Sequence, residues 1–307
     1  MNKSLPLVTV IIPCYNHEHD ITICIESIYR QTYQNIEVIV IDDDSTDGSV
    51  AIIEHLNRQY SFEFIKHSKN IGLIDTLNEV IHHHANGKYI KAIAGDDYLP
   101  DDSIMILVDE IEKQGASCSF VYGKAQSFKY EQGKEKLLPL VIGQKTTRNE
   151  FLFGSNKVTG GAALFNKEYY IKEIGMMPNI YVEDLYMWIK LSRHYQFSFV
   201  DKVVSYYQME SNTTSMSKNN SKMIMGVIAA ISINLIQDKL LNEEDVYQFY
   251  RKIDHDYVYF ITTYLNHTIK KDKKNALKLY IENMIFFIKK RRFKTLLSFW
   301  IKLVVYS

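Results

Sequence analysis

The sequence has few cysteines and lacks the paired spacing of metal or disulfide frameworks. Cys14, Cys24 and Cys118 are the three in 307 residues, and they form no C-x-x-C pair. An odd, widely spaced set predicts neither a disulfide framework nor a zinc knuckle. Reduced thiols are typical of the cytosol, so we expect a cytoplasmic protein.

Net charge and long apolar runs are also missing. Lys plus Arg and Asp plus Glu number 36 each, so no overall field attracts nucleic acid, and we expect no nucleic-acid partner. No run of 18 uncharged apolar residues occurs, which argues against a spanning helix. The N-terminal apolar run is short and interrupted by Pro13, which predicts a strand and not a signal peptide.

Strand and helix patterns alternate along the first hundred residues. Continuous apolar, largely β-branched runs predict strands buried on both faces at 7–13, 36–42 and 88–95, with helix-period segments between them. This alternation predicts an α/β fold with a mostly parallel central sheet flanked by helices.

The pattern changes further along the chain. A helix is expected at 101–115 and a strand at 117–128, followed by a polar, Lys-rich connection. Beyond Asn212 the pattern is almost wholly helical. We therefore expect a domain over 1–217, with its halves dividing near residue 105, and a helical C-terminal region over 218–307.

Polar residues follow three predicted strands, where open parallel sheets bind ligands. "PCYN" follows the first, "DDDS" the second and "GDDY" the last. Adjacent Asp96 and Asp97 repel each other, so such a pair often marks a divalent cation, but a turn that caps the next helix accounts for them equally well.

Asp43, at the end of the second predicted strand, could accept hydrogen bonds from a nucleotide. The alternative is that this segment is simply the start of a helix: Ser45 or Thr46 would cap it, and the negative charge of Asp47 would interact favourably with the helix dipole.

Three motifs in register resemble the nucleotide-sugar domain of family 2 glycosyltransferases, which have the GT-A fold. They are "VTVIIPCYN", "IEVIVIDDDSTDGS" and "NIGLIDTLNEVIHHHANGKYIKAIAGDDYLPDDSI", and the resemblance covers about Leu5 to Thr214. It implies an enzyme that moves a sugar from a nucleoside diphosphate, with UDP favoured, to an acceptor hydroxyl. It also implies inversion at the anomeric carbon and a requirement for Mn²⁺ or Mg²⁺.

The resemblance assigns roles residue by residue. It implies that the donor-binding residues are Pro13, Tyr15, Asn16, Asp43 and Asp96, and that Asp97 is a metal ligand. Three positions depart from the family pattern: Gly95 replaces an acid, Leu77 replaces an Arg, and Glu210 stands where relatives have a His. Glu210 is either a second metal ligand or an idle surface residue. With fewer protein ligands, the cation would depend more on the diphosphate.

An inverting transfer also needs a base on the acceptor side. The resemblance implies that Asp184 is this base and that Glu183 orients it. Without the resemblance, the simpler interpretation is that both acids are present because negative charge is stabilising at a helix N-terminus. Gly160 and Gly161 would let the backbone approach an acceptor closely, although a turn or a strand bulge would use glycines too.

The C-terminal segment from Lys270 combines Lys/Arg clusters with aromatic residues, a composition that suits an anionic membrane surface. Packing on the catalytic domain and a homo-oligomer interface are the alternatives. We expect a peripheral enzyme on the inner face of the cell membrane that extends a glycan or lipid-linked acceptor in surface polysaccharide synthesis. A nucleotidyltransferase on a related fold and a non-catalytic nucleotide-sugar binding module stay open.

Overall fold

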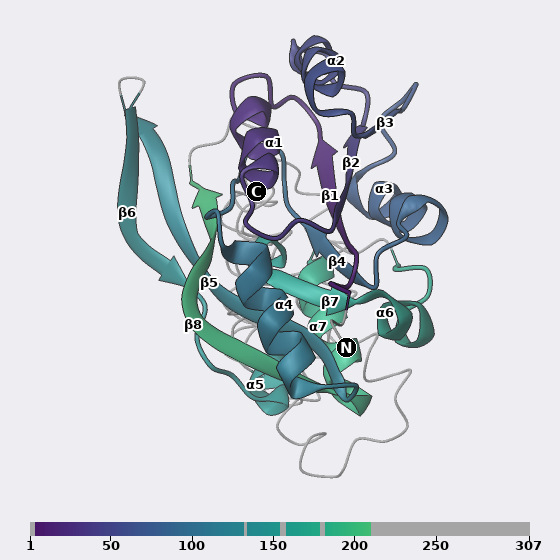
Figure 1. The fold of residues 1–307 in the computed structure, drawn as a ribbon, viewed down its shortest axis with the longest axis vertical. Coiled ribbons are helices and arrows are strands. Elements are labelled where there is room, and N and C mark those ends of the chain that lie inside the picture. The colour runs from purple at the N-terminus through teal and green to yellow at the C-terminus, as the bar shows by residue number, and fades with distance from the viewer. Residues whose placement is uncertain (1–3, 132–133, 154–157, 179–181, 210–307) are drawn as a thin grey trace, which may run out of the picture. The chain divides into compact units, whose positions relative to one another are not determined.

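The computed structural model describes residues 4–131, 134–153, 158–178 and 182–209 (Figure 1). The chain divides into two units, Met1–Ser215 and Met216–Ser307, and every described residue belongs to the first. The predicted boundary near residue 217 and the predicted helices after it lie outside the described residues. Within the described ranges, no helix has the length and apolar character needed to cross a bilayer.

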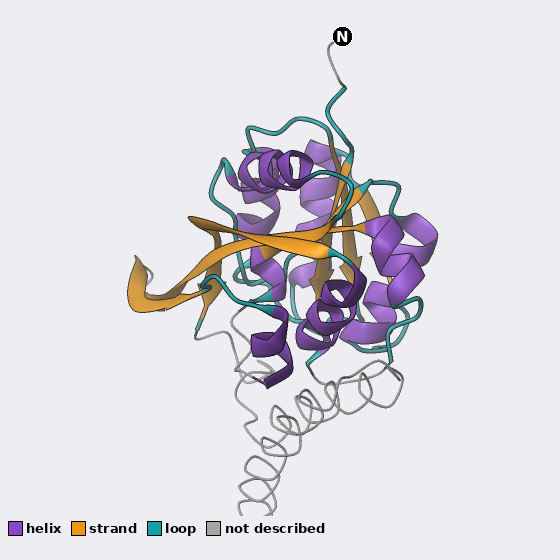
Figure 2. Ribbon diagram, turned by 90° about the horizontal axis from the view of Figure 1, so that it is seen from below, coloured by secondary structure: helices purple, strands orange, loops and turns teal. Residues whose placement is uncertain are grey.

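The described strands form one sheet in the order β3-β2-β1-β4-β7-β5-β6, with β8 paired to β5. Helices cover both faces of this sheet (Figure 2). The strands are β1 (Val8–Cys14), β2 (Ile36–Asp42), β3 (Glu63–Lys66), β4 (Tyr89–Ala92), β5 (Cys118–Glu131), β6 (Lys134–Ile142), β7 (Ala163–Asn166) and β8 (Gln196–Gln208). The helices are α1 (Ile21–Tyr29), α2 (Ser49–Tyr60), α3 (Leu73–Glu79), α4 (Ser103–Gln114), α5 (Arg148–Phe153), α6 (Lys167–Glu173) and α7 (Glu183–His194), with a π-helical turn η1 (Val80–His84) and a 3₁₀ turn η2 (Gly160–Ala162).

The first half of the sheet is parallel throughout. β1 pairs with β2 on one side and β4 on the other, and β3 pairs with β2. Val10, Ile11 and Ile12 have no exposed surface, because helices cover this part of the sheet on both sides; this burial is why the strand is a continuous apolar run. The predicted strands and the α/β fold class are confirmed.

The second half of the sheet is mixed. β7 runs antiparallel to β4 and β5, β6 runs antiparallel to β5, and β8 runs parallel to β5. Long β5 therefore has β8 along one side and β7 followed by β6 along the other. The parallel character predicted from the first hundred residues does not extend into the antiparallel pairs, whose strands come from later in the chain.

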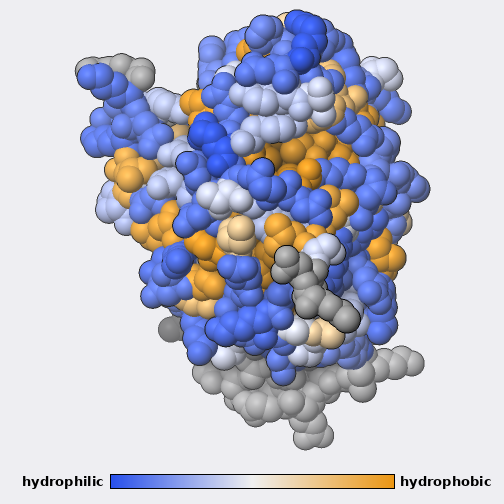
Figure 3. Space-filling view, viewed as in Figure 1, coloured by the Kyte–Doolittle hydropathy of each residue, from blue (hydrophilic) through white to orange (hydrophobic). Residues whose placement is uncertain are grey.

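The polar, Lys-rich segment after β5, predicted only as a connection, contains a strand. Lys134–Ile142 forms β6, which pairs with β5 as a projecting arm (Figure 1). Most of its side chains are exposed, and Leu137, Leu140 and Val141 are 52%, 46% and 42% exposed. Apolar surface accordingly shows along this arm in Figure 3. A strand that is exposed on both faces has no buried alternation in its sequence, so the period-2 signal was absent.

The polar strand ends meet at one edge, as predicted. Cys14 is aligned with Asp42 in the parallel register, and the Asp43 N–H donates to Cys14 O at 2.9 Å. On the other side of β1, the Gly95 N–H donates to Pro13 O at 3.2 Å. The residues after β1, β2 and β4 therefore lie side by side.

Candidate active site

The loops after β1 and β2 are joined through Asn16. Its backbone N–H donates to Ser45 Oγ at 2.9 Å, and its side-chain oxygen accepts from the Thr46 N–H at 2.8 Å. Asn16 has a φ of 60°, a conformation that asparagine tolerates better than most residues. Tyr15 beside it is 36% exposed. Asn16 therefore braces the loop that presents Tyr15.

The expected helix cap in the second loop is wrong in its residues. α2 begins at Ser49, and Gly48 occupies the N-cap position. Ser45 and Thr46 instead bond across to Asn16. Asp47 does lie at the helix start, where its Oδ1 accepts from the Ser49 N–H at 2.9 Å.

Asp43 is a buried carboxylate held by three donors. Its Oδ1 accepts from the Ile71 N–H at 2.8 Å and lies 2.7 Å from His67 Nδ1. Its Oδ2 accepts from the Gly72 N–H at 2.8 Å. Gly72 has a φ of 89°, a backbone conformation that glycine adopts without strain. The segment after β3 thus wraps around the predicted base-binding acid.

Asp97 is fixed by the last described strand. It is 6% exposed, and its Oδ1 accepts from the Gln208 N–H at 3.0 Å. Next to it, Tyr98 and Tyr206 exchange two backbone hydrogen bonds and stack their rings 4.5 Å apart. Burial, and then the neighbouring charge of Asp96, raise the pKa of Asp97. The capping alternative is wrong for Asp97, because α4 begins only at Ser103.

A buried lysine that the sequence analysis missed lies near Asp97. Lys91 has no exposed surface, and its Nζ donates to Gly161 O. Burial lowers its pKa to about 7, against the opposing effect of the Asp97 charge. The signal was present in the sequence: a lysine in the middle of an apolar strand with two buried faces must find a polar partner.

The Gly160–Gly161 turn lies between Asp97 and Asp184. A Cβ atom built on Gly161 would lie 3.5 Å from Asp97 Oδ2, and one built on Gly160 would lie 3.9 Å from Asp184 Cβ. Asp184 is in the first turn of α7, and its Oδ1 accepts from the Leu185 N–H at 2.6 Å. The structure therefore brings two predicted carboxylates next to one glycine turn, Asp97 beside Gly161 and Asp184 beside Gly160.

Glu183 is half-buried at the start of α7. Burial, followed by the charge of adjacent Asp184, raises the pKa of Glu183 to about 8. The ionised form of Glu183 is therefore disfavoured next to the charge of Asp184.

The residues present give a divalent cation one buried carboxylate. Asp97 fits this role, because a bound cation would stabilise the charged form that burial disfavours. A Cβ atom in place of Gly95 would lie 3.1 Å from Ile21 Cδ1 and 3.2 Å from His17 Cδ2, so an acid here would require these two side chains to shift by a few tenths of an ångström. In the part of the chain that the structure describes, no three His, Cys, Asp or Glu side chains form a metal-binding group. Glu210, the other predicted ligand, lies outside that part.

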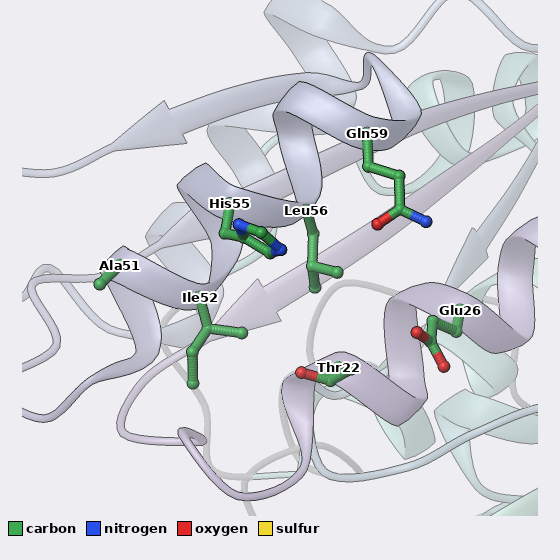
Figure 4. A pocket seen from close by; sticks show the side chains of 7 residues that line it. All are labelled: Thr22, Glu26, Ala51, Ile52, His55, Leu56 and Gln59. Atoms are coloured by element: carbon green, nitrogen blue, oxygen red, sulfur yellow. The ribbon is translucent and has the colours of Figure 1, made fainter.

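A separate pocket of about 430 Å³ lies between α1 and α2 (Figure 4). None of the predicted site residues lines it; its lining is Thr22, Glu26, Ala51, Ile52, His55, Leu56 and Gln59. Leu77, the position where a family Arg was missing, is 6% exposed on α3 and belongs to the buried core.

Carboxylates clustered at the carboxyl ends of parallel strands are typical of α/β proteins that bind ligands at this edge of the sheet. The profile of glycosyl transferase family 2 matches residues 9–173, which is more than half of the chain. The chain therefore belongs to this family and is a glycosyltransferase with the GT-A fold.

Relatives and solved structures agree with this assignment. An uncharacterized glycosyltransferase of Haemophilus influenzae is 27% identical over 239 residues, which are 72% of this chain and 71% of that protein. The Escherichia coli UDP-Glc:alpha-D-GlcNAc-diphosphoundecaprenol beta-1,3-glucosyltransferase WfgD is 26% identical over 219 residues, 69% of this chain and 81% of that protein. The match to Streptococcus pneumoniae GlyG, 33% identical, covers 36% of each chain.

The fold is that of S. aureus TarS 1–349, whose crystal structure contains UDP-GlcNAc. The TM-score is 0.67 at 14% identity, over 95% of this chain and 90% of that one. A mannosyltransferase from Pyrobaculum calidifontis, solved with GDP-Man and Mn²⁺, has a TM-score of 0.59 at 17% identity, over 98% and 86% of the two chains.

Proposed function

We propose that the chain is an inverting glycosyltransferase that moves a sugar from a UDP-sugar to a hydroxyl of a glycan or lipid-linked acceptor during surface polysaccharide synthesis. The observation that carries this proposal is the Gly160–Gly161 turn, which has Asp97 next to Gly161 and Asp184 next to Gly160. Donor and acceptor must meet within bonding distance in a transferase. A turn without side chains between the two acids leaves room for that meeting.

In this proposal Asp184 is the base. It takes the proton from the acceptor hydroxyl while that oxygen attacks the anomeric carbon on the face opposite the leaving diphosphate. The raised pKa of Glu183 fits an orienting role for Glu183, because burial and the charge of Asp184 disfavour its ionised form. A general base must be ionised to accept a proton.

In this proposal, Asp43, Asp96 and the loop that carries Tyr15 bind the nucleotide of the donor. Asp43 lies buried at the end of β2 with its oxygens held in place, which suits a group that orients a nucleotide base. The relatives favour uracil: WfgD is named for UDP-Glc, and TarS carries UDP-GlcNAc. We assign ribose contact to Asp96, and base contacts to the Pro13–Asn16 loop.

Asp97 would hold Mn²⁺ or Mg²⁺, with Glu210 proposed as a second ligand. A divalent cation supplies positive charge to the leaving diphosphate when it is bound. The protein's own contribution is to keep the Asp97 carboxylate in place through Gln208 and the Tyr98–Tyr206 pairing. The Mn²⁺ found with the Pyrobaculum mannosyltransferase supports this part of the proposal.

We further propose peripheral attachment to the inner membrane face through the basic and aromatic segment after Lys270. Its composition supports contact with anionic lipid. The diphosphoundecaprenol acceptor in the printed name of WfgD supports a lipid-linked acceptor. An acceptor that is anchored in the membrane is reached most readily by an enzyme bound to the same surface.

A thermal-shift series on the full chain tests this function. UDP, GDP, dTDP and CMP are each added with and without Mn²⁺, because a ligand that binds only the folded state raises the unfolding temperature. We expect the largest rise with UDP and Mn²⁺ together. The absence of a rise with every nucleotide would contradict the proposal.

A further inference from the structure

His67 lies between two carboxylates, one of which is the proposed base-binding acid. Its Nδ1 is 2.7 Å from Asp43 Oδ1, and its Nε2 is 3.2 Å from Glu79 Oε2. The His67 side chain is 11% exposed. The residue directly follows β3, and its backbone N–H donates to Asp42 O at 2.9 Å. Backbone and ring together therefore fix the imidazole against the end of β2.

Glu79 holds the ring from the outer side. It is the last residue of α3, so His67 connects that helix with the carboxylate after β2. The second oxygen of Glu79 lies 4.0 Å from His84 Nε2. His67 thus has a fixed partner on each nitrogen and cannot turn away from Asp43 without losing one of them.

These contacts limit what Asp43 can still accept. A carboxylate has about four acceptor positions, two on each oxygen. Ile71 N–H and His67 Nδ1 occupy both positions on Oδ1, and Gly72 N–H occupies one on Oδ2. Counting only partners from the described residues, one acceptor position remains on Asp43, on Oδ2.

We propose that His67 is a positioning residue that selects the base of the nucleotide donor. It occupies Oδ1 and leaves Asp43 a single acceptor position, which matches the one ring N–H of uracil or thymine. Guanine presents two adjacent donors, on N1 and N2, and these need both oxygens of a carboxylate. This inference rests on the proposed function, because it requires that Asp43 meets the base.

Two substitutions test the roles of the two ring nitrogens of His67 separately. In His67→Asn the amide nitrogen takes the place of Nδ1 and still donates to Asp43, while in His67→Gln it takes the place of Nε2 and reaches only Glu79. A base-selecting histidine would tolerate Asn and not Gln. A histidine that only holds Asp43 in place would also tolerate Asn better than Gln, so the UDP-to-GDP preference is the readout that distinguishes the two roles.

The experiment measures UDP and GDP dissociation constants by calorimetry on the full chain with Mn²⁺. We expect wild type to prefer UDP by at least about 10-fold, and His67→Asn to stay within about 3-fold of wild type for UDP. His67→Gln should bind UDP about 10-fold more weakly, a loss of about 1.4 kcal/mol. The UDP-to-GDP preference should narrow at least about 10-fold in this variant, because Oδ1 regains a free position. His55→Gln on the exposed side of α2 is the matched control and should behave as wild type.

Each outcome decides the matter. Equal effects of Asn and Gln, or an unchanged UDP-to-GDP ratio, would overturn the role of His67 while UDP binding by wild type kept the proposed function intact. Wild type that binds neither nucleotide would overturn both. If His67→Gln does not fold, Glu79→Ala replaces it: removing only the outer partner should narrow the same ratio by a smaller factor, and an unchanged ratio would reject the proposal.

Discussion

Gly161 lies directly against Asp97: a Cβ atom added to the glycine would be 3.5 Å from Asp97 Oδ2 and 3.3 Å from Ser205 Oγ. At Gly160 the nearest atom to such a Cβ is Asp184 Cβ, at 3.9 Å. The two glycines therefore differ in the space they leave. This difference gives a matched pair of substitutions.

We expect Gly161→Val to lower the transfer rate at least about 10-fold. The branched side chain would push against Asp97 and Ser205, and a displacement of about 1 Å in an active site can cost about 10²-fold. Gly160→Ala adds one methyl group at an ordinary contact distance and should stay within about 3-fold of wild type. Initial rates with a UDP-sugar and acceptor measure both, and wild-type rates in both variants would show that the turn does not border the site.

Asp97→Asn should lose transfer activity without losing stability. The amide oxygen can still accept from the Gln208 N–H, so the hydrogen bond to β8 survives. The charge that would bind the cation is removed, which should lower the transfer rate by about 10²-fold or more. Because burial raises the pKa of Asp97, neutralising this side chain should leave the unfolding temperature unchanged or higher.

The matched control for Asp97→Asn is Asp101→Asn. Asp101 is exposed and pairs with Arg30 Nε at 3.4 Å, an interaction that contributes little at a surface. Its loss should change neither activity nor the unfolding temperature measurably. An active Asp97→Asn enzyme that retained its Mn²⁺ response would remove Asp97 from the metal site.

Asp184→Asn should separate chemistry from binding. Loss of a general base lowers the rate by about 10²–10⁴-fold, while the UDP dissociation constant should stay within about 2-fold of wild type. Single-turnover rates and calorimetry give the two quantities. Glu168→Gln removes another first-turn helix acid, at the exposed start of α6, and should be silent. Full turnover by Asp184→Asn would favour a non-catalytic role for this acid and exclude it as the base.

Glu183→Gln should flatten the pH dependence of stability. The pKa of Glu183 is raised from 4.5 to about 8, so between these values the folded state holds a proton that the unfolded state has lost. The contribution of this group to stability is therefore greatest below pH 4.5 and declines as pH rises toward about 8. Gln carries no titrating proton and avoids that decline.

The measurement is a set of thermal unfolding curves between pH 5 and pH 8.5 for both proteins. We expect the unfolding temperature of the variant to rise relative to that of wild type as pH increases. In a domain of this size, the rise is about 2–4 °C for each kcal/mol of difference in the free energy of unfolding. A constant difference across the pH range would mean that Glu183 titrates alike in the folded and unfolded chain.

The sequence was sufficient for the parts of the site that depend on strand burial. Strands covered on both faces must be continuous apolar runs, so β1 and β2 were visible, and the acids at 42–44 were placed at a sheet edge. Asp96 and Asp97 followed in the same way from the end of β4. The three motifs in register identified the family, which its profile confirms.

Contacts between distant segments could not be predicted. The hydrogen bond from the Gln208 N–H to Asp97 Oδ1 joins residues 111 positions apart, and neither segment contains a local pattern that predicts it. His67 carried no pattern because its role depends on a helix end and a strand end that meet only in the fold. Arm strand β6 was missed because its exposure leaves no buried face to mark it.

The Gln208–Asp97 bond also fixes an order of events during biosynthesis. The segment around Asp97 leaves the ribosome well before β8, because the 111 residues between Asp97 and Gln208 take roughly 6–22 s to translate. Until β8 arrives, the carboxylate has no strand to hold it. A nascent chain that ends before β8 therefore lacks the backbone N–H that holds the Asp97 carboxylate.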